Sequence, residues 1–207
     1  MHWQRRTTLM VIIAALLVVL AGGSAWAAGL VPFINRGTPI HGTAFDPNTP
    51  APNFTLEEAG SKQVQLSDYR GKVVLLYFGY TYCPDICPTT LATLARARDS
   101  LGAEASKVQV IMVTVDPQRD TADRLTSYVK KFDPSFIGLT GTLAQIQPIA
   151  SSYGIYFQAE APSGSGGYTV DHTAAVTMID PQGNRRLLES YGTTSDQFAA
   201  DIRSILH

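Results

Sequence analysis

A continuous apolar run at residues 73–80 constrains the fold of this chain more than any other feature. A strand covered on both faces has such a run, whereas a strand with one wet face alternates between apolar and polar residues. Residues 108–115 predict a second buried strand. Because segments with helical periodicity follow both strands, we expect an α/β fold with helices packed on a central sheet.

Two hairpins are expected beside this α/β core. Their strands are separated by short turns that contain Gly60 and Gly183, as is typical of antiparallel pairs. The four strands are residues 54–57 with 63–66, and residues 174–179 with 186–191.

Four helices are expected, each beginning near a residue that favours a helix start. These residues are Pro88, Asp120, Thr142 and Thr194. The last two are followed three positions later by glutamine, which is typical of a capping box. The inward faces are expected to carry Leu91, Leu94, Leu101, Leu125, Tyr128, Val129, Phe132, Leu143, Ile146, Ile149, Tyr153, Phe198, Ile202, Ile205 and Leu206.

The N-terminal segment, residues 1–34, is expected to be a membrane anchor or a signal segment. A bilayer-spanning helix needs about 20 apolar residues, and residues 9–34 are long enough and carry no charge. Arg5 and Arg6 precede this run, which favours an N-terminus inside and a domain outside. A cleaved signal peptide is the alternative, because Ala25-Trp26-Ala27 fits a cleavage site. The apolar run continues past that site, which favours the uncleaved anchor.

Residues 35–52 are expected to be a linker, because four prolines interrupt any periodic pattern there. The folded domain is then residues 53–207. Residues 163–167 contain only glycine and serine and predict a flexible loop within it. The whole chain has a formal net charge of −1, so it offers no basic patch for nucleic acid.

The two cysteines, Cys83 and Cys87, lie where the first buried strand ends and a helix begins. The positive end of a helix favours the thiolate form, which binds soft metals or attacks disulfides. On a regular helix their Cβ atoms would lie roughly 5–6 Å apart, against about 3.8 Å in a disulfide, which favours a metal. Each cysteine precedes a proline, however, and this disfavours helical backbone. A disulfide in the metal-free protein therefore stays open.

A third ligand for a soft metal would have to come from histidine. Of the four histidines, His2 precedes the apolar run, His41 lies in the expected linker and His207 ends the chain. Only His172 lies inside the predicted fold. Two thiolates and an imidazole suit copper or zinc, but a lone histidine beside a strand is also commonly a structural residue. The residues alone leave both readings open.

Four segments in chain order resemble the Sco/SenC family. They are residues 79–88, 115–121, 138–141 and 170–183, and the resemblance extends from about residue 52 to the C-terminus. It implies a thioredoxin-like fold with an N-terminal hairpin and an inserted loop, preceded by one transmembrane helix. The family's two cysteine ligands fall on Cys83 and Cys87, and its histidine ligand falls on His172. Thr177 departs from the family, where we expect an aromatic residue.

The resemblance implies a copper metallochaperone rather than an enzyme. Such a protein would carry Cu(I), and also Cu(II), to the dinuclear copper site of cytochrome c oxidase subunit II or to a related copper acceptor. It would be a single-pass protein of the cytoplasmic membrane with its soluble domain in the periplasm. Other periplasmic copper or thiol carriers would be further partners.

The alternative is a thiol-disulfide oxidoreductase that uses Cys83 and Cys87 to reduce the cysteines of the oxidase copper site. A peroxidase is a weaker alternative, because Cys83 lacks the Thr-x-x-Cys pattern with a following arginine.

Overall fold

The computed structural model describes residues 40–161 and 167–207 of this chain. The expected membrane anchor and most of the expected flexible loop lie outside these ranges. Within them, no helix combines the length and the apolar character that a bilayer crossing requires.

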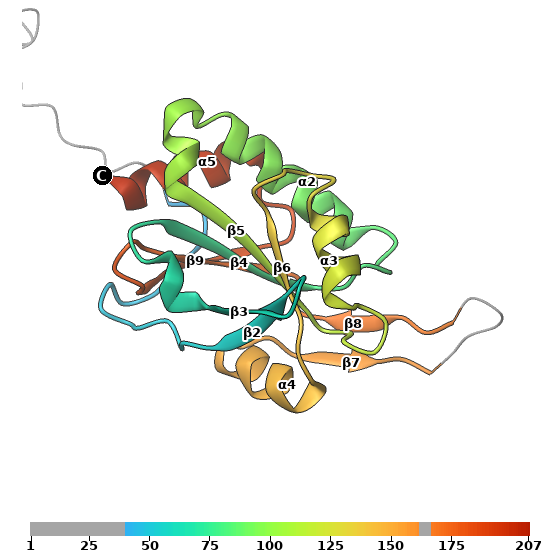
Figure 1. Cartoon of the computed structure of the whole chain (residues 1–207). Coiled ribbons are helices and arrows are strands. Elements are labelled where there is room, and N and C mark those ends of the chain that lie inside the picture. The colour runs from blue at the N-terminus through green and yellow to red at the C-terminus, as the bar shows by residue number, and fades with distance from the viewer. Residues whose placement is uncertain (1–39, 162–166) are drawn as a thin grey trace, which may run out of the picture. The chain divides into compact units, whose positions relative to one another are not determined.

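A six-stranded mixed sheet forms the centre of the fold, with strand order β1-β10-β9-β4-β5-β6 (Figure 1). β4 pairs in parallel with β5, which pairs in parallel with β6, whereas β9 runs antiparallel to β4. The strands are β1 (Thr43–Ala44), β4 (Val73–Gly79), β5 (Val108–Thr114), β6 (Ile137–Leu139), β9 (Ala175–Ile179) and β10 (Arg185–Ser190).

The two strands predicted to be buried, β4 and β5, are confirmed as neighbouring interior strands of this sheet. Every residue of β4 and of β5 is buried. A strand so enclosed removes apolar surface from water on both faces, at about 25 cal/mol for each Å² buried. The carboxyl end of β4 leads directly into the segment that carries the two cysteines.

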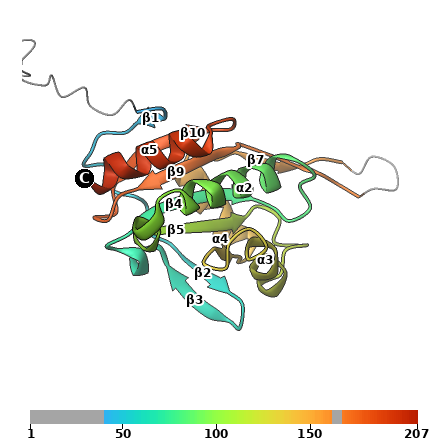
Figure 2. The ribbon, with the colours of Figure 1, turned by 90° about the horizontal axis from the view of Figure 1, so that it is seen from above.

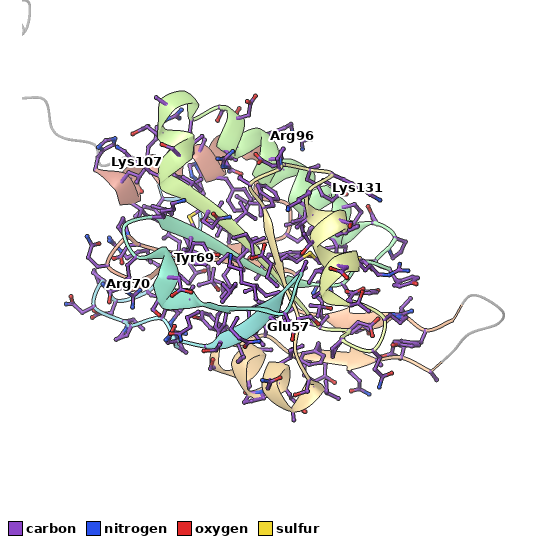
Figure 3. The ribbon with its side chains drawn as sticks, viewed as in Figure 1. Glu57, Tyr69, Arg70, Arg96, Lys107 and Lys131 are labelled. Carbon is purple, nitrogen blue, oxygen red and sulfur yellow. The ribbon has the colours of Figure 1, made fainter. Side chains whose placement is uncertain are left out.

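Helices cover both faces of the sheet. They are α2 (Ile86–Asp99), α3 (Ala122–Val129), α4 (Leu143–Ser152) and α5 (Ser195–Leu206), with short 3₁₀ helices η1 (Leu66–Tyr69) and η2 (Gly102–Lys107). α2 and α5 lie side by side on one face, and α4 lies on the other (Figures 1 and 2). The exposed cations Arg96, Lys107 and Lys131 point outward from three different segments (Figure 3).

The helix starts differ from the prediction at two of four places. α2 begins at Ile86, so that Pro88 lies in its first turn, where proline needs no hydrogen-bond partner. α3 is capped by Thr121, whose hydroxyl accepts from Arg124 N, and not by Asp120. Capping boxes at Thr142 and Thr194 are confirmed.

One inward position was predicted wrongly. Leu143 is 46% exposed, because it is the first residue of α4 and lies off the face that packs on the core. Ile146 and Ala150 form the buried side of that helix instead.

Both predicted hairpins are confirmed. β2 (Thr55–Glu58) pairs antiparallel with β3 (Lys62–Gln65), and β9 pairs antiparallel with β10. A third antiparallel pair was not predicted. It consists of β7 (Phe157–Ala159) and β8 (Val170–His172), and it lies beside the central sheet rather than in it (Figure 1).

The described part of the expected linker packs onto the domain. β1 pairs with β10 through Thr43 and Leu188, and Phe45 N donates to Arg186 O at 2.9 Å. Ala51 is buried. This segment therefore adds a short strand to the sheet edge, and the packed structure includes residues before 53.

Candidate metal site

Cys83 lies in the connection between β4 and α2, residues 80–86, which we call the cysteine loop. Cys87 lies in the first turn of α2. Cys83 is half-buried in the loop, Cys87 is buried in the helix, and both are free thiols. The backbone at Asp85 is not helical (φ −141°), so the two cysteines do not share one continuous helix, but Cys87 is helical although it precedes Pro88. The N–H group of Cys87 points at Cys83 Sγ, 3.4 Å away.

The sulfur of Cys87 is enclosed by residues at the carboxyl end of β4. Tyr77 Oη donates to it at 3.3 Å. A Cβ atom at position 79 would lie 2.9 Å from this sulfur, so the absence of a side chain at Gly79 makes room for it. Sequence analysis had not given Tyr77 or Gly79 a role in the site.

His172 approaches from the other side, on β8. Its Nε2 lies 3.5 Å from Cys87 Sγ. Its Nδ1 lies 3.3 Å from the carbonyl oxygen of Thr173, which can only accept, so Nδ1 carries the proton. The lone pair of Nε2 is thereby directed toward the sulfurs. The rings of Tyr77 and Tyr80 pack edge-on against the imidazole, with centroids 6.1 and 5.9 Å away.

The three residues that sequence analysis singled out thus come together. One donor atom from each of Cys83, Cys87 and His172 lies within 4.8 Å of the others. Across residues 40–161 and 167–207 no other group of this kind is found. His41 instead contacts Asp201, and His207 contacts Glu104; His2 lies outside the described residues.

The two thiols differ in acidity. A hydrogen bond from the Cys87 thiol lowers the pKa of Cys83 to about 3, against burial, which raises it. The same hydrogen bond, together with burial, raises the pKa of Cys87. The pair therefore consists of a thiolate at Cys83 and a thiol at Cys87 near neutral pH. A metal that binds both sulfurs must displace the second proton.

An open cleft of about 650 Å³ gives access to the site from one side. Cys83 and His172 line it, whereas Cys87 does not. Asp171 also lines the cleft and is exposed, and its carboxylate is not among the three converging donors. Tyr156, which is 63% exposed, lies on the same rim.

A second polar cluster next to the site was missed. Arg119 donates through Nε to Asp116 and through Nη1 to Tyr168 O, the latter at 2.8 Å. Tyr168 Oη donates to Asp116 Oδ1 at 2.7 Å. Residues 115–121 had been singled out as a motif, but a sequence does not show that its arginine meets a tyrosine so distant along the chain.

The two cysteines lie where a central strand ends and a helix begins, and a histidine from a separate hairpin joins them. This arrangement is that of a thioredoxin-like protein whose side chains can bind a metal. A profile of the SCO1/SenC family matches residues 43–207. The chain belongs to this family.

Relatives and solved structures agree with this assignment. The human protein SCO2 homolog, mitochondrial, is 40% identical over 149 residues, which are 68% of this chain and 56% of the human protein. The chain thus matches little more than half the length of that relative.

Two solved structures are similar over most of the chain. The solution structure of apo Sco1 from Thermus thermophilus has a TM-score of 0.73 at 39% identity and covers 80% of this chain and 96% of that one. The structure of Bradyrhizobium japonicum ScoI with copper bound has a TM-score of 0.68 at 35% identity and covers 76% and 99%.

Proposed function

We propose that this protein binds copper through Cys83, Cys87 and His172 and delivers it to the dinuclear copper site of cytochrome c oxidase subunit II or to a related acceptor. The convergence of the three donor atoms within 4.8 Å carries the proposal. Two sulfurs and an imidazole are ligands that copper prefers. A family member of known structure contains copper, which supports the same cargo here.

Delivery would proceed by exchange of ligands at the open cleft. Cys83 and His172 face the cleft, so ligands of an acceptor can reach the ion from that side while Cys87 holds it from behind. Cu(I) suits the sulfurs, and Cu(II) would be served by the imidazole and by oxygen donors at the rim.

The proposed location is the extracytoplasmic side of the cytoplasmic membrane. Residues 9–34 would form a single membrane anchor with Arg5 and Arg6 inside. In this position the domain would receive copper from other periplasmic carriers and meet an oxidase subunit in the same membrane.

The test is an anaerobic Cu(I) titration of the purified full-length protein against a chromophoric chelator. Wild type should bind one ion. His172→Ala should weaken binding by at least about 100-fold, because even residues that only orient a ligand cost about 10- to 100-fold when removed. Undiminished binding by His172→Ala would defeat the ligand assignment.

The acidity of Cys83 favours a second candidate function, a thiol-disulfide oxidoreductase. Its thiolate could attack an acceptor disulfide to form a mixed disulfide. Cys87, after losing its proton, would then displace the acceptor thiol, leaving a Cys83–Cys87 disulfide and a dithiol acceptor. Exchange with an oxidised peptide that contains two cysteines tests this. His172→Ala that loses copper yet exchanges disulfides normally would assign the imidazole to copper alone.

A further inference from the structure

Arg119 lies between the two parts of the site. Its guanidinium carbon is 3.6 Å from the ring centroid of Tyr168 and 4.7 Å from that of Tyr82. Tyr82 immediately precedes Cys83 in the cysteine loop. Tyr168 belongs to the segment of residues 167–173 that carries His172, which we call the histidine arm. One cation therefore packs against an aromatic ring from each part.

Polar contacts fix the arm to the same arginine. Arg119 donates to the carbonyl oxygen of Tyr168, and Asp116 accepts both from Arg119 Nε and from the Tyr168 hydroxyl. Guanidinium is suited to this arrangement, because it donates in its plane while its faces stack on rings. A further contact joins the arm to the loop, since Val170 N donates to Tyr80 Oη at 3.3 Å.

The segment that contains Arg119 is itself anchored to the cysteine side. Asp120 is fully buried and accepts from Thr81 N at 2.9 Å and from Thr81 Oγ1 at 2.5 Å. Thr114 Oγ1 at the end of β5 also donates to it, at 2.8 Å. Residues 114–120 are thus held to the sheet and to the cysteine loop before Arg119 reaches the arm.

The arm has little support of its own. β8 has three residues and pairs only with β7 among the described strands. An isolated two-stranded ribbon is marginally stable at best. The position of the imidazole therefore depends also on contacts from outside the ribbon: Val170 is buried in the core, Tyr77 and Tyr80 pack on the ring, and Arg119 holds Tyr168.

We infer that Arg119 is a positioning residue for the proposed copper site: it holds the histidine arm against the cysteine loop and so keeps His172 within reach of an ion on the two sulfurs. This inference rests on the proposed function. Without the guanidinium, copper would keep two thiolates, but the imidazole would leave more often. Affinity would fall and release would accelerate.

The experiment compares Arg119→Met with Arg124→Met in the full-length protein. Arg124 is a matched control, because it stacks on Tyr82 from the exposed side, with its guanidinium carbon 4.9 Å from the ring, and is not among the cations that stack on Tyr168. Arg119→Met should bind Cu(I) about 10-fold more weakly and release it to a chelator about 10-fold faster, as befits loss of a partly buried cation–π contact and its hydrogen bonds. Arg124→Met should stay within about 2-fold of wild type.

Two further measurements separate positioning from general stability. In the metal-free protein, amide hydrogen exchange at residues 168–172 should accelerate in Arg119→Met while β4 and β5 keep their protection. In a His172→Ala background, Arg119→Met should have no further effect on copper binding, because it acts through the imidazole. Arg119→Lys keeps the charge but not the planar stacking and should not restore affinity.

The outcomes separate the inference from the proposed function. If wild type binds copper and Arg119→Met behaves like Arg124→Met, the positioning role is wrong and the copper site stands. If wild type binds no copper, the proposed function fails. Unchanged amide hydrogen exchange at residues 168–172 in Arg119→Met would then overturn the positioning role as well. Should Arg119→Met unfold, Tyr168→Leu removes the ring that stacks at 3.6 Å, and wild-type copper affinity in that variant would also overturn it.

Discussion

The cysteine loop and the histidine arm meet at one point but are supported in different ways. The loop joins β4, buried along its whole length, to α2, whose Cys87, Leu91 and Leu94 are also buried. The arm ends in a three-residue strand outside the central sheet. The sulfurs are therefore placed by a long buried strand and a helix, whereas the imidazole is placed by a short strand with one buried residue, Val170, and by side-chain contacts from outside its ribbon. Changes to the core should alter global stability, and changes near the arm should alter local opening.

The largest effect is expected from Leu91→Ala in α2. This side chain is fully buried, and its loss should lower the free energy of unfolding by about 2–5 kcal/mol. Urea denaturation measures this. Leu143→Ala, at an exposed leucine, is the control and should change it by less than about 0.5 kcal/mol. Similar losses in the two variants would contradict the assigned core.

Gly79→Ala probes the contact between sheet and sulfur directly. The new methyl group would lie 2.7 Å from a ring carbon of Tyr77 and 2.9 Å from Cys87 Sγ, so packing must shift. We expect a loss of about 1–3 kcal/mol in the free energy of unfolding. Thermal unfolding of the metal-free protein checks this, and a variant as stable as wild type would show that the pocket is looser than described.

A buried acid on β10, Glu189, tests the scaffold without a change to any proposed copper ligand. Burial and the neighbouring charge of Asp201 raise the pKa of Glu189 to about 7. Below pH 4.5 the carboxyl is protonated both in the folded and in the unfolded protein. As the pH rises from there through 7, the unfolded chain ionises first, so stability falls.

Glu189→Gln should remove this fall and gain about 1–3 kcal/mol over wild type at pH 8, with less difference at pH 5. Urea denaturation at both values measures it. Amide hydrogen exchange in the histidine arm should not change, because Glu189 lies on β10 and not in the arm. A stability difference between the variant and wild type that is larger at pH 5 than at pH 8 would contradict the raised pKa of Glu189.

The smallest effect on stability is expected from Tyr168→Phe in the arm. It removes the hydrogen bond to Asp116 but keeps the ring over Arg119. The free energy of unfolding should fall by about 1 kcal/mol or less, while amide exchange at residues 168–172 accelerates. If β4 lost protection to the same degree, the loop and the arm would be one cooperative unit and the contrast between them would fail.

The same contrast explains what could be predicted from the sequence. β4 and β5 were visible because both of their faces are buried, which leaves a continuous apolar run. The boxes at Thr142 and Thr194 were visible because capping is local. β6, β7 and β8 were not, since three residues are too few for any periodicity to show.

For the site, the cysteines were located by their place between strand and helix, but His172 needed the family resemblance. Its approach to Cys87 depends on a hairpin that has no local signal. Asp120 was mistaken for a cap because its partners, Thr81 and Thr114, are tertiary contacts. The role of Arg119 depends on a long-range contact in the same way.

If the protein delivers copper as proposed, the unequal exposure of the two sulfurs gives the transfer an order. A visiting protein that enters through the cleft meets Cys83 and His172 first and reaches Cys87 last. The transfer would then be directional. The bond from Cys87 to the ion would be the last to break, so the ion would stay bound to at least one of the two proteins throughout.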